Sequence, residues 1–363
     1  MKALLRLSFF LFSLGVSAFF TADLVHSATA EDVIKKIRAL PAPRRKSVLE
    51  EGAKKEGQAV IYTSMSLSEY PMVMGAFEKA YPFVKTNAFR STPSGVFRRA
   101  DTEFKAGRYA VDVIMSAAVE MWNLKQGQLS THYVSPEGNA YPSGAIDSGG
   151  YWSAYEVTPI VLAFNTKMVP PHEVPLSYEA LLDPKWKGKM NLGTDEYAWL
   201  HVMLQHMGKE KGLDYMRALA KQQLHMPGSS SVMRAQLTLA GESAIAIAAR
   251  GRRITEFKEK GAPIDFRILD PYAAEPSLLA MMRRSPNPHA GILFYDWLLT
   301  ADAQAMISDL TGRISIRKGI KRHPRIQELF QKDFVFVQPS ALGSGLKETM
   351  ELYHQIFGLH RPK

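Results

Sequence analysis

The stretch QAVIYTS, residues 58–64, is an apolar run of strand length that ends in two hydroxyl residues. Residues 67–81 follow it with apolar side chains at helical spacing, and a second apolar run occupies residues 84–89. A helical pattern over residues 94–106 and the run VDVIM, residues 111–115, complete the series. Strands that alternate with helices are typical of a mostly parallel sheet covered by helices. The sequence therefore predicts an α/β fold.

The same alternation resumes beyond residues 135–150, a stretch rich in Gly, Pro and Ser that indicates a boundary. The further predicted strands are residues 157–164, 189–192, 244–248, 265–269 and 277–282. The further predicted helices are residues 195–207, 212–222, 232–240, 254–260, 287–300, 301–310 and 344–357. Thr194 or Asp195 is the expected N-cap of the first of these helices. The chain thus contains two predicted α/β units.

The composition describes a globular protein of about two domains. The chain has 363 residues, of which 46% are hydrophobic, with 45 Lys and Arg against 35 Asp and Glu. It has no cysteine, which excludes disulfides, thiolate metal sites and a cysteine nucleophile. The net charge of +10 can steer anionic small molecules or an acidic partner surface, and it can equally serve solubility.

Residues 1–30 have the pattern of a secretory signal peptide. Lys2 and Arg6 precede the uncharged run over residues 7–22, and small residues at 28–30 offer a cleavage site after Ala30. The alternative is a membrane anchor, but the run is shorter than the ~20 residues that a spanning helix needs. We therefore expect a periplasmic protein, and export argues against a nucleic-acid partner.

Hydroxyl residues follow each strand of the first unit. Thr63, Ser64 and Ser66 follow the first strand, Thr92 follows the second and Ser116 the third. In open α/β sheets the ligand lies beyond the carboxyl ends of the strands, where helix N-termini and hydroxyls can hold an anion. The alternative is that each hydroxyl only caps its helix. Three such positions together favour a binding site.

The second unit has its own candidates beyond its strands. They are Asp195, Tyr197, Ser230, Arg234, Arg250 and Arg252, with Tyr155 beside the boundary where a cleft would open. A guanidinium can bind a carboxylate or phosphonate through two hydrogen bonds, and we expect one of the three arginines to do so. Losing that arginine should weaken ligand binding without lowering stability. The alternatives are that Asp195 is an N-cap and that Arg252 begins a solvated helix.

Enzyme motifs are absent from the sequence. It contains no G-x-S-x-G, H-E-x-x-H, P-loop or G-x-G-x-x-G motif. His201 and His206 are five residues apart and would not share a helix face as metal ligands, while Asp195 and Glu196 are neighbours that point in different directions. We expect a protein without catalytic residues, metal ligands or cofactor.

Several segments together resemble periplasmic solute-binding proteins of ABC importers, in the ferric-iron-binding-like group. They are EGQAVIYTS (56–64), YAVDVIMS (109–116), VLAFNT (161–166), LLDPKWKGK (181–189), AGE (240–242) and residues 294–312. The resemblance covers about residues 50–320, and the segment 181–189 is its most telling part. It implies a two-lobed periplasmic binding protein type 2 architecture with the ligand cleft between the lobes.

The resemblance also implies a division of the chain and a set of partners. We expect lobe 1 to consist of residues 31–154 and 275–363, and lobe 2 of residues 155–274. Closure would be a hinge motion near residues 155–159 and 270–276. The expected partners are a small-molecule solute and ABC permease subunits at the inner membrane, and the expected state is a monomer.

One departure from the ferric-binding members bears on the ligand. Where those members place two adjacent iron-binding tyrosines, this sequence has Gly251 and Arg252, and residues 65–67 lack the histidine of their first loop. Ferric iron requires anionic oxygen ligands, so a guanidinium inverts the charge that the site attracts. The ligand is therefore predicted to be a small organic anion. The alternatives are ferric iron or a metal–anion complex and, from another class, an exported hydrolase.

Overall fold

The structure is a computed structural model and describes residues 29–359. The predicted signal peptide lies outside these residues except for Thr29 and Ala30. The strands are β1 (Gln58–Thr63), β2 (Lys85–Arg90), β3 (Val113–Ser116), β4 (Ser153–Asn165), β5 (Met190–Asn191), β6 (Ile245–Arg250), β7 (Ile264–Arg267), β8 (Ala273–Met281) and β9 (Val335–Phe336). Every strand expected from the sequence is present, and β9 is an addition.

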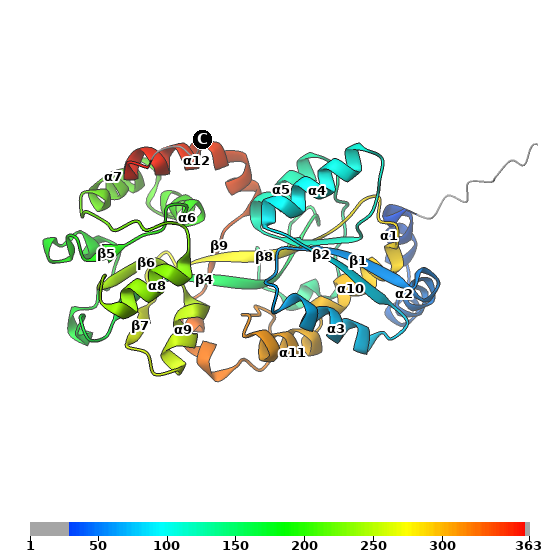
Figure 1. Ribbon diagram of the computed structural model, residues 1–363. Helices are drawn as coiled ribbons and strands as arrows, with labels where there is room; N and C mark the ends of the chain where they lie inside the picture. Colours follow the sequence, from blue (N-terminus) through cyan, green and yellow to red (C-terminus); the bar gives the residue numbers. More distant parts are fainter. Residues whose placement is uncertain (1–28, 360–363) are drawn as a thin grey trace, which may run out of the picture.

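The helices surround these strands on both sides (Figure 1). They are α1 (Ala30–Arg38), α2 (Ala42–Glu56), α3 (Tyr70–Ala80), α4 (Pro93–Lys105), α5 (Ala118–Gln126), α6 (Tyr197–Met207), α7 (Lys209–Ala220), α8 (Ser231–Ala240), α9 (Gly251–Glu259), α10 (Pro288–Leu299), α11 (Ala301–Thr311) and α12 (Pro339–Phe357). Short 3-10 helices include η5 (Pro324–Phe330). The predicted fold class, a two-lobed α/β protein, is confirmed.

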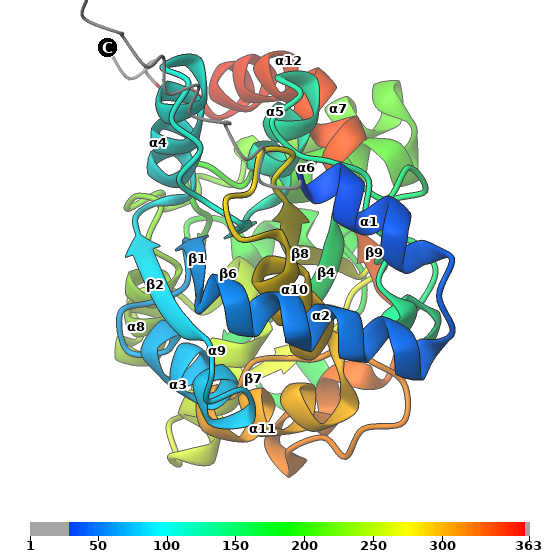
Figure 2. The ribbon, with the colours of Figure 1, turned by 90° about the vertical axis from the view of Figure 1, so that its right-hand side faces the viewer.

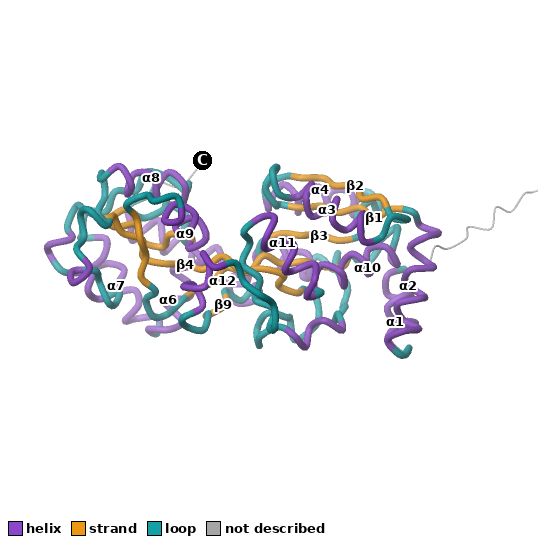
Figure 3. The backbone as a smooth tube through the Cα atoms, turned by 90° about the horizontal axis from the view of Figure 1, so that it is seen from below, coloured by secondary structure: helices purple, strands orange, loops and turns teal. Residues whose placement is uncertain are grey.

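The sheet is mixed and runs through both lobes in the order β2-β1-β3-β8-β4-β6-β5. β1 is parallel to β2 and β3, as strand–helix–strand alternation predicts. Antiparallel pairs occur where β8 joins β3 and where β4 joins β8, β6 and β7. β4 and β8 thus form the ribbon that connects the two lobes, which lie on either side of it in Figure 3.

This connecting ribbon contains residues 155–159, the first segment expected to act as a hinge, and the end of the second, since β8 begins at Ala273. Ser153 pairs with Leu279 at one end of the β4–β8 ladder, and Pro159 pairs with Ala274 at the other. The first half of β4 therefore lies in the sheet of lobe 1 and its second half in the sheet of lobe 2. The exact division of the chain into lobes stays a prediction.

Helix α12 packs on both lobes. It contacts α5 in lobe 1 and α6 and α7 in lobe 2, and it runs across the top of Figure 1. The Tyr353 hydroxyl donates to the Gly193 carbonyl at 2.5 Å, and the Tyr197 hydroxyl lies 2.8 Å from His354 Nε2. The C-terminal helix is therefore a third connection between the lobes, besides β4 and β8.

Helices α1 and α2 lie in a basic, proline-containing segment for which the sequence analysis predicts no helix. Thr29 and Asp32 form a capping box at the start of α1, while α2 packs against α10 (Figure 2). Val33 and Ile37 are buried and four residues apart, so they share one face of α1. The proline at the start of α2 occupies a position where its missing N–H has no intrahelical partner to lose.

Candidate functional site

A cavity of about 240 Å³ lies between the two lobes beside the connecting ribbon. Lobe 1 contributes the start of α5, lobe 2 the start of α6, and β4, β8 and α12 supply the remaining walls. Its lining residues are Ala117, Ala118, Val119, Thr158, Asp195, Tyr197, Ala198, Glu275, Pro276, Ser277, Val337, Leu342 and Leu346. A solute held here would contact both lobes at once.

Two helices begin at this cavity without a side-chain cap. Ala117 precedes α5 and Glu196 precedes α6, and neither side chain accepts a hydrogen bond from its helix. The expected cap by Thr194 or Asp195 is wrong, because α6 begins at Tyr197 and Glu196 occupies the N-cap position. The first N–H groups of a helix and its dipole favour negative charge. The cavity therefore offers two electropositive helix ends from opposite lobes.

Two carboxylates also line the cavity, Asp195 from lobe 2 and Glu275 from β8. Burial and the neighbouring Glu196 raise the pKa of Asp195 above its ordinary value. Burial likewise raises the pKa of Glu275, although Arg250 opposes this effect. Both groups can accept hydrogen bonds from an amino or hydroxyl group of a solute.

Behind this wall, two arginines and two glutamates form a chain of ion pairs. Arg250 lies 3.1 Å from Glu196 through Nη1 and 3.1 Å from Glu275 through Nη2, and Arg234 pairs with Glu196. The carboxylates raise the pKa of Arg250 despite its burial, so the guanidinium is firmly charged. Together with Asp195 the cluster holds three carboxylates against two guanidinium groups, which gives it a net negative charge.

Arg234 lies in the core of lobe 2 instead of at the cavity. Its side chain is 1% exposed, and Nη1 donates to the Ile247 carbonyl at 2.8 Å. The backbone at Gly193 passes over this pair so closely that an added Cβ would lie 2.8 Å from Glu196 Oε1. The expectation that Arg234 faces the cleft is wrong. Its helix, α8, directs the guanidinium toward β6.

A second ion-pair cluster joins the lobes at Glu69, which lies between β1 and α3. Arg252 of lobe 2 donates to Glu69 at 3.0 Å and to the Thr311 carbonyl at 2.9 Å, while Arg313 binds both Glu69 and Glu156. Burial by itself raises the pKa of the Glu69 carboxyl. The guanidinium groups of Arg313 and Arg252 outweigh burial and hold this pKa below its ordinary value. Arg252 is thus an interlobe contact that is already neutralised.

The remaining predicted site residues have local roles in the structure. Thr63 is buried and its hydroxyl accepts from the Met65 N–H at 3.1 Å. Thr92 and Ser230 are N-caps of α4 and α8, so for them the capping alternative describes the observed contact. Tyr155 is buried in β4.

Of the predicted serines of lobe 1, Ser116 is adjacent in sequence to a residue of the cavity wall. Ser116 immediately precedes Ala117 of the cavity wall, and its buried hydroxyl has no hydrogen-bond partner. The Ser64 N–H donates to the Met115 carbonyl at 3.0 Å, and the Ser66 hydroxyl lies 3.3 Å from that of Ser68. Among the predicted residues, Asp195 and Tyr197 line the cavity, Ser116 precedes the wall residue Ala117, and Arg250 pairs with the wall residue Glu275.

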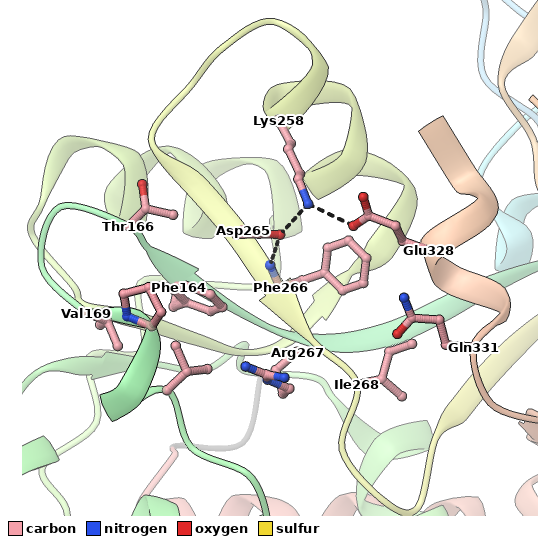
Figure 4. A pocket seen from close by; sticks show the side chains of 12 residues that line it. Phe164, Thr166, Val169, Lys258, Asp265, Phe266, Arg267, Ile268, Glu328 and Gln331 are labelled. Atoms are coloured by element: carbon pink, nitrogen blue, oxygen red, sulfur yellow. Dashed lines mark hydrogen bonds and ion pairs between the residues drawn. The ribbon is translucent and has the colours of Figure 1, made fainter. Parts of the chain in front are cut away.

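Another cavity, of about 320 Å³, lies between β7, α9 and η5 and is shown in Figure 4. Lys258 projects from α9 toward its rim and pairs with Asp265 at 2.9 Å and Glu328 at 2.7 Å. Its one ammonium group is therefore shared by two carboxylates. The lining of this cavity comes from lobe 2 apart from Glu328 and Gln331, and no residue of the sheet or helices of lobe 1 that precede η5 contributes to it.

Within residues 29–359, no group of three or more His, Asp or Glu side chains is placed to hold a metal ion. The same part of the chain contains no helix that is long and apolar enough to cross a membrane.

The fold is shared with solved periplasmic binding proteins at low sequence identity. FutA (IdiA) of Trichodesmium, in complex with iron and citrate, is 17% identical with a TM-score of 0.73, covering 83% of this chain and 99% of its own. Iron-bound HitA of Pseudomonas aeruginosa is 18% identical with a TM-score of 0.71, covering 82% and 99%.

AfuA of Actinobacillus pleuropneumoniae, bound to exogenous fructose-6-phosphate, is 19% identical with a TM-score of 0.68, covering 84% of this chain and 100% of its own. At such identities the likeness shows the fold alone. Residues 110–311, more than half of the chain, match the model of the bacterial extracellular solute-binding proteins. The chain therefore belongs to the bacterial extracellular solute-binding protein family.

Proposed function

We propose that this chain is the periplasmic solute-binding component of an ABC-type importer, binding a small organic anion between its lobes and delivering it to the permease subunits. One observation carries the proposal: the uncapped starts of α5 and α6, from opposite lobes, meet at one cavity. An anion that accepts hydrogen bonds from both helix ends would stabilise the arrangement in which the lobes are close. In this proposal the chain acts as a monomer without catalytic activity.

The arginines enter this proposal differently from the sequence-based expectation. Arg250 and Arg252 are each neutralised by carboxylates, and Arg234 is buried. The anionic group would therefore be held by backbone N–H groups and hydroxyls such as Ser116 and Ser277. AfuA, which shares the fold, is known with a sugar phosphate bound, so the fold can accommodate an organic anion.

The two carboxylates at the cavity restrict the class of solute that we propose. Asp195 and Glu275 would repel a solute whose surface is wholly anionic, and they suit an amino or hydroxyl donor. We therefore propose an anion that also carries such a group. A purely cationic solute is the second candidate, favoured by the net negative charge of the cluster formed by Asp195, Glu196, Glu275, Arg234 and Arg250. Ferric iron or a metal–anion complex stays the third candidate, although residues 251 and 252 are Gly and Arg, which cannot supply the anionic oxygen ligands that ferric iron requires.

Our first prediction concerns this solute class. In a thermal-shift screen with matched carboxylates and phosphonates, the ligands that carry an amino or hydroxyl group should raise the melting temperature most. A ligand at one hundred times its dissociation constant stabilises the protein by about 2.7 kcal/mol. Asp195→Asn should lower the affinity for the best ligand by tenfold or more, because a hydrogen bond to a charged group is lost. The exposed Asp309, in α11, gives the control variant Asp309→Asn, which should bind normally.

The same screen separates the alternatives. Polyamines that bind while every anion fails would replace the anion with the cationic candidate. Stabilisation by ferric citrate alone would support the metal–anion alternative instead. Because the pKa of Asp195 is raised, an amino-bearing solute should bind more weakly as the pH falls toward that value and the carboxylate is protonated.

A further inference from the structure

A third cavity, of about 380 Å³, lies outside the interlobe site and has a different chemical character. It is formed mainly by the segment between α11 and α12, with Pro142 and Ser143 on the opposite wall. Its lining residues are Pro142, Ser143, Ile316, Lys318, Arg322, Phe330, Lys332, Asp333, Phe334 and Phe336. Strand β9 separates this third cavity from the interlobe cavity. Phe336 lines the third cavity, and the next residue, Val337, lines the interlobe cavity.

The charged groups of this cavity are unbalanced. Lys318, Arg322 and Lys332 line it against the single carboxylate of Asp333. None of these four side chains forms an ion pair with another residue of the described chain. By contrast, Arg317 and Arg325, which flank Arg322 in the sequence, pair with Glu137 at 2.5 Å and Glu259 at 3.2 Å. The cationic groups of this cavity are therefore available to a ligand.

Arg322 is held in place without an acceptor. Its guanidinium carbon lies 3.9 Å from the centroid of the Phe330 ring, a cation–π contact that fixes its plane. Its Nε atom is buried and has no hydrogen-bond partner in the structure. Burial lowers the pKa of Arg322, as expected for a cation removed from water without a counter-ion. A ligand oxygen at this position would satisfy the donor and the charge together.

The remaining wall of the cavity is aromatic. Phe334 packs against Phe330 with ring centroids 5.4 Å apart and against Phe336 at 6.1 Å. Ile316 and Pro142 add apolar surface on the other side. A flat, apolar body would fit against these rings, while an inorganic anion would leave them exposed to water.

We propose that this cavity is a second binding site, for a small aromatic carboxylate or sulfonate whose anionic group contacts Arg322 and whose ring lies against the phenylalanines. The site is independent of the solute proposed for the interlobe cavity. Its lining carries three cationic groups against one carboxylate, whereas the interlobe cluster holds three carboxylates against two guanidinium groups.

The test is titration of the full-length mature protein with naphthalene-1-sulfonate by calorimetry. Wild type should bind one equivalent, and the uncharged 1-naphthalenemethanol should bind at least tenfold more weakly. Arg322→Gln should lower the affinity for the sulfonate by tenfold or more, and Lys332→Gln should lower it by a few-fold. Lys321→Gln is the matched control, because Lys321 is exposed in the same segment but does not line the cavity, and it should bind as wild type does.

Three results would overturn the proposal. They are no binding to wild type at millimolar ligand, equal affinity for the alcohol and the sulfonate, and unchanged affinity in Arg322→Gln. Should Arg322→Gln fail to fold, as judged by circular dichroism, Lys332→Gln decides the question, because Lys332 is exposed and its loss leaves the core intact.

Discussion

Replacing Arg234 with alanine is expected to lower the free energy of unfolding by about 3–5 kcal/mol, because it breaks a buried ion pair and leaves the Glu196 carboxylate with one counter-charge fewer. The Arg234 and Glu196 side chains are each 1% exposed, and the guanidinium also holds the Ile247 carbonyl at 2.8 Å. Arg250 alone would remain to neutralise Glu196, from 3.1 Å. Urea denaturation followed by circular dichroism measures this loss.

The control for Arg234 removes both charges. The double variant Arg234→Met with Glu196→Leu should be more stable than Arg234→Ala, since well-packed apolar residues can replace a buried pair at little cost. Arg250 would keep its contact with Glu275 in that variant. A loss below about 1 kcal/mol in Arg234→Ala would show that the pair is accessible to water, and would restore Arg234 as a candidate ligand residue.

Replacing Asp112 with alanine should destabilise the protein by about 3 kcal/mol or more, because each buried donor left without an acceptor costs about 1–3 kcal/mol. Asp112 is fully buried and immediately precedes β3. It accepts hydrogen bonds from the Val60 N–H at 2.7 Å, the Ser285 hydroxyl at 2.6 Å, and the N–H and side-chain amide of Asn287 at 2.7 and 3.1 Å. The carboxylate thus fixes the start of α10 to the central sheet. Thermal unfolding measures the loss.

The pH dependence of stability gives a second readout for Asp112. Burial raises the pKa of Asp112 to about 6, although four hydrogen bonds oppose the change. Between about pH 4 and 6 the folded protein therefore keeps a proton that the unfolded chain releases, so the stabilisation from this group falls as the pH rises. As the pH rises from about 4 to about 6, the free energy of unfolding of wild type should fall by about 3 kcal/mol relative to that of Asp112→Asn. A difference between the two proteins that does not vary with pH would contradict this assignment.

The sheet was predictable because its strands are short apolar runs bounded by turn residues. The prediction was least complete at the connecting ribbon, where the strand expected at residues 157–164 is extended to Ser153–Asn165. Glu156 and Glu275 lie in β4 and β8 and interrupt the apolar pattern there. These polar residues contact arginines of the two ion-pair clusters, which a local pattern cannot indicate.

The candidate site was predictable only in part. Asp195 and Tyr197 were found because they follow a predicted strand, where α/β sheets place ligands. Glu196 is adjacent in sequence, but its partner Arg234 is 38 residues away on another helix, so the pair that occupies both groups could not be inferred from spacing. The wall formed by α12 comes from the end of the chain, and no local feature connects Leu342 with α5 or α6.

The central claim is that the solute binds between the lobes and brings them together. The chain contains no cysteine, so spin labels at Arg98→Cys in α4 and Lys211→Cys in α7, both exposed, would report one distance between the lobes. The measurement is the distance distribution by electron–electron double resonance, with and without the ligand that most raises the melting temperature. We expect a saturating ligand to shift the distribution to shorter distances. A distribution that stays unchanged with this ligand bound would show that it binds elsewhere than between the lobes, or that binding does not close them, and would contradict the account.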